Sequence, residues 1–242
     1  MVFGLFSKEK SLQKTIERAI NKLSQQPDRW GALEKLKEDG SDAALYGLCK
    51  RFGVTSMKGV EDEQEKNWVV DVLVANGAGT LPPLERYMKN AEQLAFPLRV
   101  LERIADRDKV LAVADELFAS EQPGYVRMPD RRIDLLRWFS EWKPGTDVEL
   151  VSRLTPYVTD FDENVRFAAI DGMAGRDPAQ IAPPLIAAML RPEEESGRIK
   201  RAIVEVLEKT KAPLGDKAKD VAAVLTGPLS DYKVDGAILK KR

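Results

Sequence analysis

The sequence predicts an all-α protein built from repeated pairs of helices, and three observations support this fold class. Large apolar residues recur at a nearly constant interval, as in helical repeat proteins. Short turns rich in Asp, Ser and Pro, which favour helix starts, separate the apolar segments. No regularly spaced runs of alternating apolar and polar residues indicate a strand-rich fold.

The repeat emerges when the segments are aligned on one large apolar anchor each, at intervals of 37, 31, 35, 34 and 34 residues. The anchors are Leu36, Leu73, Ile104, Phe139, Met173 and Leu207. Four positions earlier stand Ala32, Val69, Val100, Leu135, Ala169 and Ile203. Three positions earlier stand Leu33, Val70, Leu101, Leu136, Ile170 and Val204. Residues three and four apart share one side of a helix, so these columns predict a buried stripe.

The chain divides into a lead-in (1–10), a repeat array (11–226) and a tail (227–242). In the lead-in, Phe3, Leu5 and Phe6 are expected to pack on the first helices or to touch a membrane surface. The array is expected to hold six helix pairs and a final unpaired helix. The expected helices span residues 11–24, 27–38, 42–52, 61–75, 81–90, 92–105, 107–119, 130–142, 147–158, 163–174, 178–190, 193–210 and 217–225.

Several of these helices have recognisable start signals. Ser41 can cap one helix through its side-chain oxygen, and Asp160 and Asp162 can do the same for another. Asp177 followed by Pro178 combines a cap with a proline at the first helical position.

The tail breaks the helical pattern at Gly227-Pro228 and again at Gly236. Its apolar residues, Tyr232, Val234, Ile238 and Leu239, are too many for a purely solvated segment. We expect an extended segment that docks on the last helices, or alternatively a ligand for another molecule.

Asp162, Val165 and Arg166 resemble the Asp-x-x-Val-Arg opening of the second helix of a HEAT repeat. The resemblance implies an α-solenoid of about six HEAT-like helical hairpins plus a terminal helix, with the second helices lining a concave surface. It also identifies a basic column seven positions before the anchors: Arg29, Lys66, Pro97, Arg132, Arg166 and Lys200. The family pairs this column with turn aspartates, here Asp28, Asp130 and Asp162; a phosphate-binding row is the alternative. Pro97 departs from the pattern.

A second column, two positions before the anchors, is mostly acidic. It contains Glu34, Asp71, Glu102, Arg137, Asp171 and Glu205. This column lies about 160° from the apolar stripe and is predicted to face solvent. In a HEAT-like stack it would form an acidic groove; alternatively it is a solvated face with local ion pairs such as Glu205 with Lys209.

Two tryptophans, Trp68 and Trp138, lie on the flank between the apolar and acidic columns. Large aromatic side chains often anchor protein interfaces. They also pack between neighbouring repeats, and both interpretations remain open.

Composition excludes several classes of site. The 242 residues include no histidine and one cysteine, and the formal net charge is −1. Ser-His-Asp and Cys-His catalysis and the usual zinc sites are therefore excluded, and we expect no catalytic residue, metal or cofactor. A lone Cys49 among apolar neighbours is expected to be an inert core thiol, typical of a reducing cytoplasm. No apolar stretch has the roughly 20 residues needed to span a bilayer.

The sequence favours a non-catalytic, cytoplasmic scaffold or adaptor that binds a partner protein with a basic surface or segment. Its predicted binding residues are the acidic column (Glu34, Asp71, Glu102, Asp171 and Glu205) with Trp68 and Trp138. An acidic groove disfavours nucleic acid. The loop from Ser120 to Pro129, with Tyr125, Arg127 and Met128, and the tail are alternative docking sites.

Two alternatives belong to other classes. The first is an enzyme, because HEAT-like arrays include DNA alkyl-base glycosylases and bilin lyases; Asp134, Arg137 and Trp138 match a glycosylase site weakly. The second is a membrane-associated adaptor that uses its N-terminal apolar residues with Lys8, Lys10 and Lys14.

Overall fold

The computed structural model describes the backbone of residues 2–242 and the side chains of residues 8–242. Over these residues the chain forms thirteen α-helices, five short 3-10 helices and one two-stranded sheet. The all-α prediction is therefore confirmed, and so is the expected number of helices. The chain divides into two compact units, Met1–Leu117 and Phe118–Arg242.

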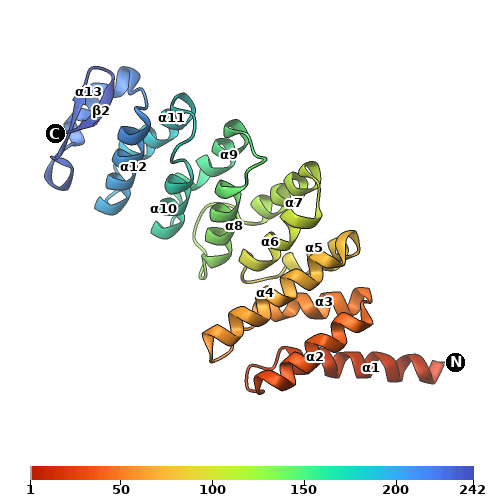
Figure 1. Ribbon diagram of the computed structural model, residues 1–242. Coiled ribbons are helices and arrows are strands. Elements are labelled where there is room, and N and C mark those ends of the chain that lie inside the picture. Colours follow the sequence, from red (N-terminus) through yellow and green to blue (C-terminus); the bar gives the residue numbers. More distant parts are fainter. Residues whose placement is uncertain (1) are drawn as a thin grey trace. The chain divides into compact units, whose positions relative to one another are not determined.

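Unit 1 is made of paired helices in two layers (Figure 1). Its elements are α1 (Val2–Ala19), α2 (Gln26–Asp39), α3 (Asp42–Lys50), η1 (Arg51–Gly53), α4 (Gly59–Ala75), η2 (Gly77–Thr80), α5 (Leu81–Met88), α6 (Ala95–Ile104) and most of α7 (Arg107–Ser120). Helices α2, α4 and α6 are successive neighbours, and α1, α3 and α5 form a second row of neighbours.

Unit 2 repeats this arrangement. Its elements are α8 (Asp130–Glu141), α9 (Asp147–Leu154), η3 (Thr155–Thr159), α10 (Glu163–Gly172), α11 (Pro178–Met189), α12 (Gly197–Thr210), η4 (Gly215–Lys217), α13 (Ala218–Val224), η5 (Gly227–Leu229), β1 (Tyr232–Asp235) and β2 (Ile238–Lys241). Helices α8, α10 and α12 are successive neighbours, and α9 packs against α11. The exposed side of α2, α4 and α6 is called the even-helix face of unit 1 below, and that of α8, α10 and α12 is called the even-helix face of unit 2.

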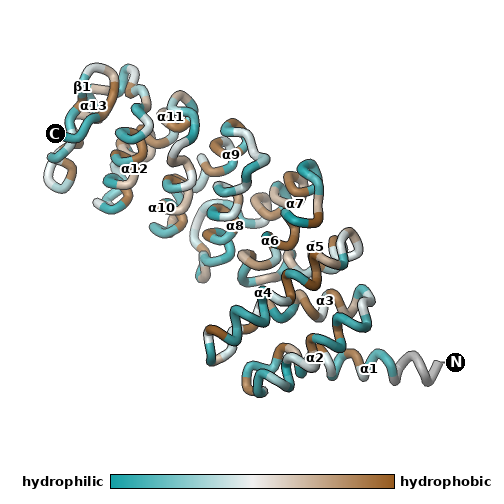
Figure 2. The backbone as a smooth tube through the Cα atoms, viewed as in Figure 1, coloured by the Kyte–Doolittle hydropathy of each residue, from teal (hydrophilic) through white to brown (hydrophobic). Residues whose placement is uncertain are grey.

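The three apolar columns form the core, as predicted. Seventeen of their eighteen residues are buried, and only Ile104 is half-buried, because it is the last residue of α6. Figure 2 shows hydrophobic and hydrophilic segments alternating along the helices, which is typical of helices that bury one stripe.

The predicted start signals are also confirmed, with one exception. Ser41, Asp162 and Asp177 each accept hydrogen bonds from backbone N–H groups at the start of α3, α10 and α11. Asp160 does not cap α10, because its carboxylate binds Arg132 and the backbone N–H groups of Gly124 and Asp162.

The first helix begins at Val2, not near Ser11 as predicted, so the expected lead-in is part of α1. Between Val2 and Ala19 the sequence contains no proline, and Gly4 is its one glycine. The helix therefore continues without interruption across this segment. The side chains of Phe3, Leu5 and Phe6 lie outside the described residues, so neither of the two expectations for them is tested.

The tail forms a β-hairpin and is not simply extended, which corrects the prediction. Strands β1 and β2 pair antiparallel with Asp235 opposite Ile238, leaving Gly236 and Ala237 as a two-residue turn. Gly236 has φ +62°, which suits a glycine at the first position of a type II′ turn. The hairpin packs against α12 and α13 and buries Tyr232 and Leu239, so the docking on the last helices is confirmed.

Candidate functional site

The predicted acidic residues of unit 1 lie on the even-helix face. Glu34 on α2, Asp71 on α4 and Glu102 on α6 are all exposed, on helices that are successive neighbours. The helix phase inferred from the apolar columns therefore places this row in solvent, as expected.

Basic side chains are interleaved with this acidic row. Arg103 on α6 forms an exposed ion pair with Asp71 at 3.1 Å. Arg99, one turn earlier on α6, donates a 3.1 Å hydrogen bond to the side-chain oxygen of Asn67. The even-helix face of unit 1 is thus an alternation of charges that bridges neighbouring helices, and its carboxylates are not a uniform acidic surface.

An aromatic pair lies beside the charged row. The rings of Trp30 on α2 and Trp68 on α4 are 5.2 Å apart at 46°, and both side chains are half-buried. The Trp30 indole N–H donates to Glu34 Oε1 at 3.2 Å, and the Lys37 ammonium lies 5.8 Å from the Trp68 ring. The pair links two helices and still presents aromatic surface to solvent, an arrangement common in interface anchors.

In unit 2, the remaining predicted residues are more dispersed. Asp171 on α10 and Glu205 on α12 are exposed, and Glu205 pairs with Arg201 at 3.0 Å, not with Lys209 as suggested. Trp138 is only 9% exposed, and its ring stacks on that of Trp142 with centroids 6.4 Å apart. Trp138 therefore packs inside unit 2, as one of the two interpretations predicted, whereas Trp68 is half-buried and keeps part of its side chain in solvent.

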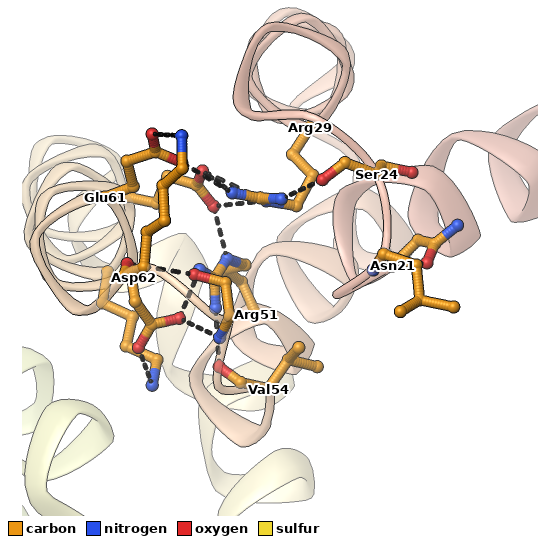
Figure 3. A network of polar contacts seen from close by, with 12 residues as sticks. Asn21, Ser24, Arg29, Arg51, Val54, Glu61 and Asp62 are labelled. Carbon is orange, nitrogen blue, oxygen red and sulfur yellow. Dashed lines mark hydrogen bonds and ion pairs between the residues drawn. The ribbon is translucent and has the colours of Figure 1, made fainter.

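Four residues of the basic column hold ion pairs, as its structural interpretation predicted, but with partners other than the predicted ones. Arg29, Lys66 and Arg132 are buried and Arg166 is half-buried. Arg29 donates through Nη2 to Glu65 Oε1 at 2.8 Å, and Arg51 donates through Nε to Glu65 Oε2 at 2.8 Å (Figure 3). Arg51 also binds Asp62 at 2.7 Å, and Asp62 accepts from Lys66 at 2.8 Å.

This buried network fixes two loops as well as two layers of helices. Arg29 donates to the carbonyl of Ser24 ahead of α2, and Arg51 donates to that of Val54 at 2.7 Å. The Ser56 N–H donates to Asp62 at 2.8 Å. Desolvation alone would raise the pKa of Asp62, but the hydrogen bonds from Lys66, Arg51 and Ser56 outweigh it and lower that pKa to about 2.

Unit 2 also joins basic-column arginines to carboxylates, with one carboxylate for each arginine. Arg132 pairs with the buried Asp160 at 2.8 Å, and Arg166 pairs with Glu194 at 2.8 Å. Both carboxylates lie 28 residues after their arginine, in the segment that precedes the next even-numbered helix. The predicted partners Asp28, Asp130 and Asp162 do not take these positions: Asp162 is turned toward the N–H groups of α10, and the other two lie in the first turns of α2 and α8.

Cys49 is fully buried, and burial raises the pKa of its thiol to about 12. A thiol with this pKa stays protonated and is a poor nucleophile. Among the described residues, no helix is long and apolar enough to cross a bilayer.

Two features of these surfaces were missed by the sequence analysis. Trp30 lies six positions before its anchor and Trp68 five before its own, so the repeat alignment puts them in different columns and gives no signal for their contact. The contact between Tyr125 and Phe161, described below, joins two loops and leaves no periodic signal. Comparison with protein-family models, with curated proteins and with solved structures gives no match.

Proposed function

We propose that this chain is a non-catalytic helical-repeat scaffold, arranged as a HEAT-like solenoid, that binds a partner protein on the even-helix face of unit 1. The observation that carries the proposal is the half-exposed Trp30–Trp68 pair beside Glu34, Asp71 and Glu102. It combines aromatic surface with charged groups on helices whose own core is already complete.

A partner with a basic segment fits this face. Such a segment would have to replace Arg103 at Asp71, and this ion pair is largely exposed. Exposed pairs contribute only about 0–1 kcal/mol, so exchanging one basic partner for another costs little. The Trp pair would then supply the apolar contact that holds the complex.

The test is affinity capture from native cell extract with quantitative mass spectrometry. Wild type is compared with Trp68→Ala and with a variant in which Glu34, Asp71, Glu102 and Asp171 are changed to Lys. A matched control changes four exposed acidic residues outside the even-numbered helices to Lys: Glu17, Asp115, Glu116 and Asp220. We expect a protein that wild type and the control both capture and that the other two variants lose. If every captured protein is retained by all four chains, the even-helix face is not the binding surface.

A further inference from the structure

Most of the highly exposed large apolar side chains occur at one kind of position in the repeats. In the described part of the chain they are Leu23, Met57, Val60, Tyr125, Met128, Val148 and Phe161. All except Val148 lie in a segment that leads into, or opens, an even-numbered helix. These segments are separate from the even-helix face, because they lie at the helix ends and not along the helix sides.

In unit 2, two of these segments bring aromatic rings together. Tyr125 precedes α8 and Phe161 precedes α10, and their rings meet edge to face at 5.3 Å and 89°. Tyr125 is nevertheless 77% exposed and Phe161 69% exposed. A fully buried aromatic side chain removes about 150–250 Å² from water, so covering both rings would bury on the order of 300 Å² more. Most of the apolar surface of the two rings therefore stays exposed to solvent despite their mutual contact.

The backbone beneath this pair is fixed by buried polar groups. Asp160 accepts a 3.1 Å hydrogen bond from the Gly124 N–H, and Arg132 donates to the Gly124 carbonyl at 2.9 Å. The buried hydroxyl of Tyr157 donates to the Glu121 carbonyl at 2.9 Å. These contacts hold the loop that carries Tyr125 against the turn that carries Phe161.

The charges near the pair favour an acidic ligand. Arg127 is exposed and has neither a hydrogen bond nor an ion pair to any described residue. The neighbouring carboxylates are engaged: Asp160 with Arg132, and Asp162 with the N–H groups of α10. Asp130 lies in the first turn of α8, where the helix dipole stabilises it.

We propose that Tyr125, Arg127, Met128 and Phe161 form a second binding surface, the aromatic loop surface, for an acidic segment of another protein. The segment would place a large apolar side chain on the two rings and Met128, and a neighbouring carboxylate on Arg127. Tyr, Arg and Met are the residue types enriched at protein interfaces.

This surface takes a ligand of the opposite charge to the one proposed for the even-helix face, so the two proposals can fail independently. The probe is a displayed library of random 12-residue peptides, selected on the immobilised full-length chain. Enriched peptides are synthesised and titrated by fluorescence anisotropy against wild type, Tyr125→Ser/Phe161→Ser, Arg127→Glu and Val148→Ser. Val148 is 62% exposed on α9 and serves as the matched control.

We expect enriched peptides in which Asp or Glu adjoins an aromatic residue or Leu. Their affinity should fall at least tenfold for Tyr125→Ser/Phe161→Ser and for Arg127→Glu, with Val148→Ser unchanged. All variants should keep the wild-type circular dichroism spectrum, because the substituted side chains are exposed. The proposal is overturned if no acidic peptide is enriched, or if the enriched acidic peptides bind all four chains alike. Sedimentation with phosphatidylserine vesicles that only the two surface variants abolish would assign the surface to a membrane and would also overturn it.

Discussion

The Nε of Arg51 donates a 2.8 Å hydrogen bond to Glu65 at a point where neither side chain has any exposed surface. Arg51 is the first residue of η1, which directly follows α3, and Glu65 comes from the middle of α4. A second arginine, Arg29, reaches the same carboxylate from α2. Three helices of unit 1 therefore meet at one buried negative charge.

Arg51→Ala should destabilise unit 1 by about 3–5 kcal/mol, because it leaves the buried carboxylates of Glu65 and Asp62 short of a partner. Arg86→Ala removes an ion pair to Asp42 of the same 2.7 Å length whose side chains are about half exposed. That control should cost at most about 1 kcal/mol. Urea titrations followed by circular dichroism measure both; equal losses would contradict the account of the buried network.

Acid should weaken the same network through Asp62. Its folded-state pKa of about 2 lies below the ordinary value of 3.8, so the ionised carboxylate stabilises the fold above about pH 4. This contribution, about 2 kcal/mol from the pKa difference, is lost as the pH falls from about 4 to 2. The free energy of unfolding should thus drop more steeply over this range in wild type than in Asp62→Asn. Parallel curves for the two proteins would show that Asp62 is not the group responsible.

Neighbouring residues on α10 should respond very differently to truncation. Ile170→Ala should cost roughly 2–5 kcal/mol, because Ile170 is fully buried and its loss leaves a cavity. Asp171→Ala should change stability by less than about 0.5 kcal/mol, since Asp171 is exposed. The urea concentration at the midpoint of unfolding is measured for both variants. Similar shifts from wild type would mean that the helix phase is wrong.

Gly172 should not tolerate a methyl group. A Cβ placed there would lie 2.7 Å from Ser140 Cβ, at the packing of α10 on α8. Gly172→Ala should therefore destabilise by about 1–3 kcal/mol. Gly31 lies inside α2 with no atom within 4 Å of its Cβ position. Gly31→Ala should be stabilising by about 0.5–1 kcal/mol, through helix propensity and a less flexible unfolded chain. Thermal melts that shift in the same direction would contradict this contrast.

The sequence predicted the core better than the polar contacts. The physical reason is that core positions follow from residues close together in the sequence, whereas the polar contacts join residues far apart in it. The apolar columns that contain Leu101 and Ile170 are local patterns, because helical periodicity relates residues three and four apart. The partner of Arg132 is Asp160, 28 residues away, and nothing local distinguishes it from Asp130 or Asp162. Choosing among those carboxylates requires the packing of neighbouring repeats.

The hairpin and the surfaces were predicted less well for related reasons. Gly236-Ala237 is a two-residue turn that begins with glycine between two short segments, which is a hairpin signal. The helical pattern of the preceding chain favoured an extended tail instead. Trp68 was predicted as an anchor without Trp30, and the contact of Tyr125 with Phe161 joins two turns with no shared periodicity. The exposure of the acidic column followed from helix phase, whereas its pairing with Arg103 and Arg201 depends on side chains from other turns and helices.

The carboxylates that pair with the basic column also have a consequence for how the loops open. Loops ordinarily exchange their amide hydrogens much faster than helices do. Here the Gly124 N–H is bonded to Asp160, and Asp160 is bonded to Arg132 of α8. The Ser56 N–H is bonded in the same way to Asp62 of α4. Opening either loop removes a hydrogen bond from a buried carboxylate. We therefore expect these loop amides to exchange more slowly than ordinary loop amides, and together with the helices that the loops join.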